Sequence, residues 1–418
     1  RFLAKMLLAS APHVCVRRHS VAYRVGSTPA SVSAAFFLRA NARLGYDFAA
    51  FEDLYVFHFS PEATARMLAC RRARDRSYAL DEWQMTLLRG LDGLPGGGAE
   101  PGGAKKFNLL DGYACAPDIP HGARVLVCMC QPHQVPWDFL KARPDLRRAA
   151  YTLESPNVRH AAQWDPVLLA DHFDVVLTYW TPLLEDPRVS TVFCAHNTHH
   201  LDMDDPLDAA QLRANRGTGA SCAMVLERRD LRGTYAVPNM PAAPLRCLDP
   251  LRERLVTGMR GVTVFGVGWD AVADRCANVR LGHALHRSRD PRHAVDILQD
   301  YTFALIVENT DAEGYASEKL YDALLAGCVP LYFGSVPPQL GVPEGPEAGL
   351  YLDLRRFLGY DADPEVPRAG ERLQAFLDSL APDTVAAWKA RVAAGREAVL
   401  RRVDTRAFAA CVTRAFEV

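Results

Sequence analysis

The sequence lacks several features that would by themselves define the class of the protein. No stretch reaches the roughly 20 consecutive apolar residues that a membrane-spanning helix requires, and no asparagine stands in the Asn-x-Ser/Thr pattern of N-glycosylation. Charge of one sign is not in excess, because 48 basic side chains face 49 acidic ones and the formal net charge is −1. This balance excludes the broad positive field that is typical of nucleic-acid-binding proteins.

Lysine is scarce, and the cysteines form no recognisable metal pattern. Six of the 48 cationic side chains are lysine, so a lysine inside a motif is unusual; they are Lys5, Lys105, Lys106, Lys141, Lys319 and Lys389. The 11 cysteines are scattered, without the double pair of a zinc site. We expect most of them to be buried thiols that pack as small apolar groups.

The apolar runs that are present predict an α/β protein with parallel sheets. The 418 residues, 49% of them hydrophobic, suffice for two or three domains. Short continuous apolar runs alternate with stretches of helical spacing, and continuous runs are typical of strands covered on both faces. The predicted strands are 55–59, 124–130, 173–179, 191–195, 222–226, 262–266, 303–307, 329–333 and 350–354.

One segment in the C-terminal half carries the most informative pattern. A strand at 303–307, a loop, a helix that begins after the N-cap Ser317 and a second strand at 329–333 follow one another. In such a unit a ligand lies beyond the end of the first strand, against the N-terminus of the helix. The helix N-terminus and Lys319 favour an anion, whereas Glu318 suits the hydroxyl groups of a ribose. The segment therefore indicates a nucleotide site.

A plainer interpretation of the same residues stays open at this point. Glu318 and Lys319 can be ordinary solvent-exposed residues of a first helical turn, with Asn309 and Tyr315 as loop residues. Neither a Walker glycine pattern nor G-x-G-x-x-G is present to decide between the two.

The residue identities in this segment are more specific for one protein family than its pattern of strands and helix. Residues 307–319 read V-E-N-T-D-A-E-G-Y-A-S-E-K, and A-G-C-V-P at 326–330 and Gly334 follow. This arrangement resembles the donor signature of the α1,3-fucosyltransferases, which runs F-E-N-S, three variable positions, D-Y-x-T-E-K, then A-G-x-V-P and a glycine. Thr310 and Ser317 depart from that pattern but keep a hydroxyl, Val307 keeps an apolar strand end, and Gly314 replaces an aspartate.

A second match lies upstream of the first. Residues 143–156 read R-P-D-L-R-R-A-A-Y-T-L-E-S-P and are similar to the family's R-P-x-G-Q-R segment that leads into E-S-P. The run at 173–179 corresponds to the family's F-N-W-T-L-S-Y. The resemblance covers roughly residues 124–354.

The resemblance implies a fold and a reaction. The family transfers L-fucose from GDP-β-L-fucose to a glycan hydroxyl with inversion, here in the α1,3 linkage, between two facing Rossmann-like lobes of the GT-B type. A single in-line displacement needs a carboxylate that takes the acceptor proton. Glu154 is the candidate for this general base, because Ser155-Pro156 turns the chain just after it. The plain alternative is a salt-bridged surface glutamate.

The resemblance also implies the contacts of the donor. Lys319 and one arginine should face the pyrophosphate, and among the arginines Arg246 fits best, with Arg228 and Arg254 as rivals. Glu318 should accept from the ribose, and Asn309 and Tyr315 should contact the phosphates or the fucose. The expected donor-binding residues are Arg246, Asn309, Tyr315, Ser317, Glu318 and Lys319.

Composition and resemblance together predict four regions. Residues 1–110 form an N-terminal extension of uncertain fold with a Gly/Pro-rich insert near 93–106, and part of 1–92 could join the following lobe. Residues 111–210 form the acceptor-side Rossmann-like lobe, 211–370 the GDP-fucose lobe and 371–418 the C-terminal helices, which could cross back to the first lobe.

Two rival functions are left open by the sequence. The acids at 202–205, Asp-Met-Asp-Asp, resemble the D-x-D of metal-dependent glycosyltransferases, and His196 to His200 lie close by. We interpret both as a polar loop, so no metal ligand and no required cofactor is predicted, with a divalent cation at most stimulatory. The other rival is a catalytically silent relative that binds nucleotide or glycan.

Location and partners follow only from the resemblance. Eukaryotic relatives are anchored in the Golgi and bacterial relatives are not, so we expect the Golgi lumen, with the cytoplasm as the alternative. The chain begins with arginine, and an anchor upstream of it is expected. The expected partners are GDP-fucose and a glycan or glycoprotein acceptor.

Overall fold

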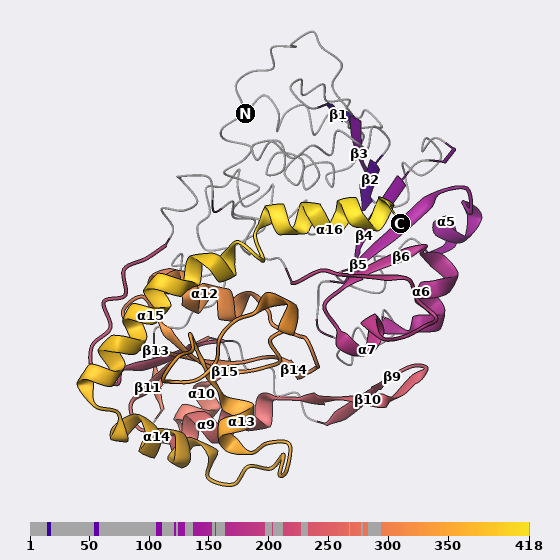
Figure 1. Ribbon diagram of the computed structural model, residues 1–418. Coiled ribbons are helices and arrows are strands. Elements are labelled where there is room, and N and C mark those ends of the chain that lie inside the picture. The colour runs from indigo at the N-terminus through magenta and orange to yellow at the C-terminus, as the bar shows by residue number, and fades with distance from the viewer. Residues whose placement is uncertain are drawn as a thin grey trace, which may run out of the picture.

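The computed structural model describes residues 15–17, 54–57, 106–110, 121–122, 124–129, 137–152, 155, 164–196, 203, 212–226, 233–266, 268–276, 279–282 and 294–417. These residues form two lobes, each built on a mainly parallel sheet, with helices after the second lobe (Figure 1). The fold class predicted from the sequence, α/β with two Rossmann-like lobes and C-terminal helices, is confirmed.

The first lobe is built on a seven-stranded sheet. Its order is β1-β3-β2-β4-β5-β6-β7, and its paired strands are parallel except for β1 with β3. The strands are β1 (Cys15–Arg17), β2 (Leu54–Phe57), β3 (Lys106–Leu110), β4 (Arg124–Met129), β5 (Arg147–Thr152), β6 (Val175–Thr178) and β7 (Thr191–Phe193). Helices α5 (Trp137–Ala142), α6 (Pro166–His172) and α7 (Thr181–Leu184) connect the later strands. The range 1–110 thus contributes three strands to this sheet.

The second lobe has a six-stranded parallel sheet in the order β12-β11-β8-β13-β15-β16. The strands are β8 (Cys222–Val225), β11 (Val262–Phe265), β12 (Arg280–Leu281), β13 (Phe303–Val307), β15 (Val329–Phe333) and β16 (Leu352–Asp353). From β8 the chain first adds β11 and β12 on one side of the sheet. It then returns to the middle of the sheet as β13 and adds β15 and β16 on the other side. The ends of β8 and β13 therefore form a topological switch point, where open α/β sheets bind their ligands.

Helices cover both faces of this second sheet. They are α9 (Asp249–Gly258), α10 (Asp270–Ala273), α11 (Ala294–Leu298), α12 (Glu318–Ala326) and α13 (Leu354–Leu358). The side chains of β13 divide between the two faces: Phe303, Leu305 and Val307 belong to one hydrophobic cluster, and Ala304 and Ile306 to another. Burial on both faces explains why the strand reads as a continuous apolar run.

A small third sheet extends from the second lobe toward the first. It contains β9 (Thr234–Val237), β10 (Met240–Cys247) and β14 (Thr310–Asp311) in the order β14-β10-β9. The β9–β10 hairpin lies beneath α7 of the first lobe (Figure 1), and at its turn Asn239 Nδ2 donates to Asp165 Oδ1 at 2.9 Å. Val237, Met240 and Leu245 pack in the core of the first lobe.

The last three helices return the chain to the first lobe. They are α14 (Ala369–Ser379), α15 (Pro382–Leu400) and α16 (Thr405–Glu417). In Figure 1 the yellow helix α16 leaves the second lobe and lies along the strands of the first. There Phe408 packs against Tyr151 with ring centroids 4.8 Å apart, and Cys411 Sγ lies 3.3 Å from the carbonyl oxygen of Phe193. The predicted crossing of the closing helices is confirmed.

All nine predicted strands are found, with ends that shift by at most two residues. Strand β5 was missed because it begins with two arginines and continues through two alanines, which have little strand preference. Strand β10 was missed because Pro241 and Pro244 argue against a strand interior. It tolerates them because its pairing with β9 is irregular between Met240 and Leu245, the stretch that contains both prolines.

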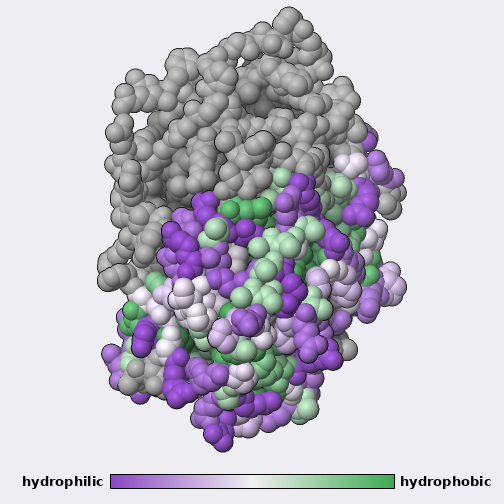
Figure 2. All heavy atoms as spheres, turned by 60° about the vertical axis from the view of Figure 1, so that its left-hand side comes forward, coloured by the Kyte–Doolittle hydropathy of each residue, from purple (hydrophilic) through white to green (hydrophobic). Residues whose placement is uncertain are grey.

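The described surface gives little sign of a large apolar patch. Among the described residues, the large hydrophobic side chains that are exposed are Val167 and Leu281, and Figure 2 shows hydrophilic and hydrophobic residues interspersed on the face brought forward.

The cysteines Cys194, Cys222, Cys247, Cys276, Cys328 and Cys411 are free thiols, and all but Cys276 are buried, as predicted. Within the described ranges no helix combines the length and apolarity needed to cross a bilayer.

Candidate functional site

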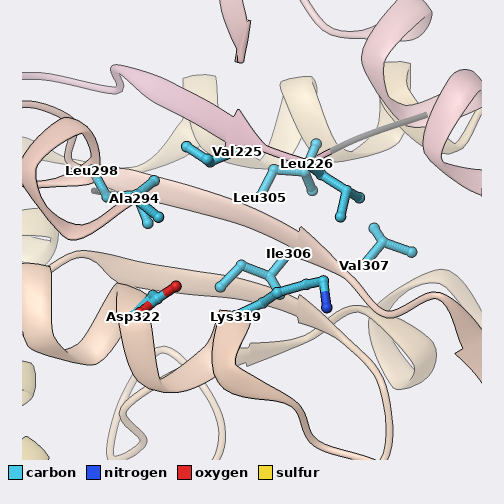
Figure 3. A pocket seen from close by; sticks show the side chains of 9 residues that line it. All are labelled: Val225, Leu226, Ala294, Leu298, Leu305, Ile306, Val307, Lys319 and Asp322. Carbon is cyan, nitrogen blue, oxygen red and sulfur yellow. The ribbon is translucent and has the colours of Figure 1, made fainter. Parts of the chain in front are cut away.

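A small hollow, partly open to solvent, lies at the topological switch point of the second sheet. Val225 and Leu226 at the end of β8 form one side and Leu305 to Val307 of β13 the floor. Figure 3 shows that Lys319 and Asp322 extend into it from α12 on the other side. The predicted lysine therefore lines a cavity at the position where the sheet topology expects a ligand.

A buried glutamate that the sequence analysis did not single out joins β13 to α12. Glu308 follows β13 directly and is completely buried. Its carboxylate accepts from the amide of Ser317 at 2.8 Å and from the hydroxyl of Ser317 at 2.7 Å. The hydroxyl of Tyr332 lies 3.2 Å from Glu308 Oε1, and burial followed by the charge of Glu308 raises the pKa of Tyr332 well above its usual value. The tyrosine therefore stays a neutral donor.

These bonds decide how the helix begins. Helix α12 starts after Ser317, as predicted, and ends at Gly327, whose φ of 71° is the left-handed value that favours glycine. The hydroxyl of Ser317 does not cap the helix, however, because it donates to Glu308 instead. One amide at the helix N-terminus is thus already occupied by a protein carboxylate.

The ammonium group of Lys319 is held between acidic partners. Its side chain is 14% exposed, and Nζ lies 3.0 Å from Glu318 Oε1, 3.5 Å from Glu308 Oε2 and 2.9 Å from the hydroxyl of Ser317. Burial lowers the pKa of Lys319, but the carboxylates of Glu318 and Glu308 outweigh it and raise the pKa above its usual value. Because a raised pKa keeps the lysine protonated, the hollow contains a fixed cation at neutral pH.

Asn309 is oriented by a buried arginine. Arg252 on α9 donates to Asn309 Oδ1 at 2.9 Å and to the carbonyl oxygen of Val307 at 2.8 Å, and it pairs with Asp249. A guanidinium group only donates, so this contact fixes which end of the Asn309 amide is oxygen. The amide nitrogen of Asn309 is then the donor left to meet a ligand.

Arg246 lies beside the loop that carries the donor motif. It stands on β10 opposite Asp311 of β14, and its guanidinium carbon is 6.0 Å from the ring centre of Tyr360. Its rival Arg254 is turned to a different part of the chain, where it pairs with Glu365 at 2.9 Å. Arg228 lies outside the described residues. Of the described candidates, Arg246 is the one next to the motif.

Tyr315 and Gly314 form a contact between the lobes. Tyr315 is 2% exposed and its ring lies 5.2 Å from that of Tyr179 and 5.9 Å from that of His196. Gly314 has a φ of 79°, and a Cβ on it would lie 2.3 Å from the carbonyl oxygen of Tyr179. The close approach accounts for glycine here, where the fucosyltransferase pattern has aspartate.

The candidate base Glu154 lies outside the described residues, but its neighbour Ser155 does not. Ser155 is completely buried, and its hydroxyl oxygen lies 3.4 Å from that of Thr310. The E-S-P motif and the donor motif, 155 positions apart in sequence at this contact, therefore meet across the two lobes.

The structure adds two residues, Arg252 and Glu308, that the sequence analysis did not assign to the site. Arg252 is one arginine among many, on a helix that carries no motif. Glu308 is part of the motif, but the residue type alone does not show whether a glutamate contacts a ligand or makes a structural hydrogen bond. The polar character of a strand end that is otherwise apolar was the one available signal for Glu308.

The metal alternative falls mostly outside the described chain. Asp202, Asp204, Asp205 and residues 197–200 are not described. Within the part of the chain that is described, no group of three or more His, Cys, Asp or Glu side chains could hold a metal ion. His196 is buried and stacks edge-on to Tyr315 instead.

The site as a whole combines groups of complementary function. A fixed ammonium favours an anion, a neighbouring carboxylate favours hydroxyl groups, and the hollow beside them has an apolar floor. These groups suit a nucleoside diphosphate attached to a sugar.

Comparisons with known proteins give local similarity. No protein-family model matches the chain. The Alpha-(1,4)-fucosyltransferase of Arabidopsis thaliana is 39% identical over 67 residues, which are 15% of this chain and 16% of that protein. A Putative fucosyltransferase-like protein of the same plant is 43% identical over 84 residues, which are 20% of this chain and 15% of that protein. The chain thus matches less than one fifth of either relative's length.

Solved structures resemble the chain only distantly. A crystal structure of an alpha1,3-fucosyltransferase has a TM-score of 0.43 at 14% identity, with 75% of this chain and 82% of that chain covered. The structure of Anabaena Alr3699/HepE in complex with UDP-glucose has a TM-score of 0.46 at 10% identity, with 87% and 98% covered. The chain therefore carries segments similar to plant fucosyltransferases, within a two-lobed fold that its own strand order defines.

Proposed function

We propose that this chain is an inverting glycosyltransferase that moves L-fucose from GDP-β-L-fucose to a hydroxyl group of a glycan, in the α1,3 linkage. The observation that carries the proposal is the position of Lys319, which lines a hollow at the switch point of the second sheet. The meeting of the two fucosyltransferase-like motifs at Ser155 and Thr310 supports it, because donor and acceptor residues must share one site.

Donor binding rearranges an existing ion pair. Without ligand, the ammonium of Lys319 is satisfied by Glu318, Glu308 and Ser317. A diphosphate would compete with Glu318 for this ammonium, and the released carboxylate would accept from the ribose hydroxyls. Glu308 is held by Ser317 and stays in place. Arg246 approaches the phosphates from β10, and Asn309 offers its amide nitrogen to the phosphates or the fucose.

The transfer itself is one displacement. Glu154 takes the proton of the acceptor hydroxyl while its oxygen attacks the anomeric carbon of the fucose, and the bond to GDP breaks on the opposite side. The departing diphosphate gains negative charge, so Lys319 and Arg246 stabilise the transition state more than the ground state. No metal ion takes part in this scheme, and a divalent cation is at most stimulatory.

Transfer assays with Glu154→Gln test the proposal. The wild-type chain should transfer fucose from GDP-fucose, and not mannose from GDP-mannose or sugars from UDP donors, to glycans on an array. Glu154→Gln should retain GDP-fucose binding and lose transfer at least about 100-fold, whereas Glu365→Gln, a change of an exposed carboxylate paired with Arg254, should keep the wild-type rate.

The same assay separates the rival functions. Transfer that EDTA abolishes and only a divalent ion restores would favour the metal-dependent rival with its acids at 202–205. Binding of GDP without any transfer would favour the silent relative. A location in the Golgi lumen stays a prediction from the resemblance.

A further inference from the structure

Two cysteine side chains meet where helix α16 lies on the first lobe (Figure 1). Cys194 directly follows β7, and Cys411 lies in the middle of α16. The sulfur of Cys411 lies 3.3 Å from the carbonyl oxygen of Phe193, the residue before Cys194, and the two thiols hydrogen-bond to each other. A disulfide places its sulfur atoms about 2.05 Å apart, so sulfurs that already share a hydrogen bond need little movement to form one.

An arginine on the same helix contacts this pair. Arg414 follows Cys411 by about one helical turn, and its Nη2 donates to the sulfur of Cys411 at 3.2 Å. Arg414 is exposed, whereas Cys411 and Cys194 are 6% and 1% exposed. The sulfur of Cys411 therefore lies directly beneath a charged group of the surface, and Cys194 is the more deeply buried of the two thiols.

The partners of Cys411 favour its thiolate form. The hydrogen bond from Cys194 and the guanidinium group of Arg414 together outweigh burial, and they lower the pKa of Cys411 below the usual value of a cysteine. Burial instead raises the pKa of Cys222 and that of Cys328. Because the thiolate is the reactive form of cysteine, Cys411 differs in reactivity from these other buried thiols.

We propose that Cys411 and Cys194 are a redox-active thiol pair, which hydrogen peroxide oxidises to a disulfide. The thiolate of Cys411 attacks one oxygen of the peroxide, the O–O bond breaks, and hydroxide leaves, so that Cys411 becomes a sulfenic acid. The sulfur of Cys194 then loses its proton and displaces the hydroxyl group from the sulfur of Cys411, and water leaves. In total, two thiols and one peroxide give one disulfide and two water molecules.

The disulfide ties the two lobes together. Helix α16 follows the second lobe in the chain and packs against β5, β6 and β7 of the first, so a covalent bond at Cys411 fixes the helix to that sheet. A cross-link between residues so far apart in sequence also restricts the unfolded chain, which stabilises the fold. The inference uses no residue of the donor site and does not depend on the proposed function.

Mass spectrometry of the full chain after treatment with hydrogen peroxide tests the proposal. The reduced wild type should lose two hydrogen atoms, and peptide mapping without reductant should find Cys194 linked to Cys411. Cys276 is the control thiol within the same chain, because it is less buried than Cys411 and its sulfur lies 3.5 Å from the carbonyl oxygen of Thr257. It should still be reduced when the link is complete.

Three variants test the roles of the two partners. Arg414→Met should slow formation of the disulfide by about 10-fold, because loss of the cation raises the pKa of Cys411 and leaves less thiolate. The matched control is Arg260→Met, which removes an exposed arginine paired with Asp378 in the second lobe and should react at the wild-type rate. In Cys194→Ser, Cys411 should stop at the sulfenic acid, which dimedone labels.

A thermal unfolding measurement gives a readout that does not rely on chemical mapping. Peroxide should raise the unfolding midpoint of the wild type, a reductant should reverse the rise, and Cys411→Ser should show neither change. The proposal is overturned if the wild type stays reduced, if Cys411 links to a cysteine other than Cys194, or if Cys276 is oxidised first. Equal rates in Arg414→Met and Arg260→Met would overturn the activation by Arg414.

Discussion

At the scale of single residues, the site depends on buried charges that hold one another. Arg252 is 2% exposed, and its guanidinium connects Asp249, the carbonyl oxygen of Val307 and Asn309. Burial lowers the pKa of Arg252, and the neighbouring charge of Asp249 opposes that shift. One arginine thus joins α9 to the end of β13 and orients a predicted donor contact.

Removing this arginine should destabilise the protein strongly. Arg252→Met breaks the buried ion pair with Asp249 and the bonds to Val307 and Asn309, and breaking a buried ion pair typically costs about 3 to 5 kcal/mol of unfolding free energy. The control is Arg254→Met on the same helix, whose ion pair with Glu365 is exposed and should cost about 1 kcal/mol or less. Urea denaturation measures both values. Equal losses in the two variants would show that Arg252 does not have this role.

The sequence could not predict the role of Arg252, although it predicted the residues that Arg252 serves. Lys319 was recognisable because lysine is rare in this chain and because this lysine lies in the first turn of a predicted helix. Arg252 carries no such signal, since arginine is common here and the contact joins residues 57 positions apart. Long-range contacts of this kind depend on how elements pack.

At the scale of elements, the loop between β14 and α12 serves two lobes at once. The whole loop belongs to the donor motif. Its middle residues Gly314 and Tyr315 contact Tyr179 of the first lobe, whereas its last residue, Ser317, bonds to Glu308 of the second lobe. The sequence predicted α12 and its flanking strands correctly, because apolar runs, an N-cap and a glycine stop are local signals. It predicted Tyr315 as a donor contact, and that role stays a prediction, since the ring is buried between the lobes.

Gly314 allows a test of this loop. Gly314→Ala must adopt a φ of 79° and place its Cβ 2.3 Å from the carbonyl oxygen of Tyr179. Gly359→Ala is the matched control, with a φ of 66° and nothing within 4 Å. The control should lose about 1 to 2 kcal/mol of unfolding free energy from the backbone alone.

Gly314→Ala should lose clearly more than this control, because the carbonyl of Tyr179 is backbone and cannot rotate away. Thermal and urea unfolding of both variants provide the comparison. If the two variants lose the same stability, the lobes do not pack at Gly314 as closely as described.

At the scale of the whole molecule, the described segments that connect the lobes include the β9–β10 hairpin, the loop before α12 and helix α16. The sequence predicted two parallel sheets and helices that return to the first lobe. It did not predict the hairpin, because its prolines argue against a strand and its stability comes from packing on the first lobe. As a consequence, the motif at 143–156 and the motif at 307–319 meet where the two lobes contact each other.

The central claim is that the start of α12, with Lys319, binds the diphosphate of a nucleotide donor. Calorimetric titration of GDP into the wild type, Lys319→Met and Lys389→Met tests it most directly. Lys389 is a lysine of α15 that donates to the carbonyl oxygen of Gly217, outside the hollow. Loss of a charged hydrogen bond costs about 1.5 to 3 kcal/mol, or about 10- to 100-fold in affinity. We predict this weakening for Lys319→Met and wild-type affinity for Lys389→Met; equal GDP affinity in all three proteins would contradict the account.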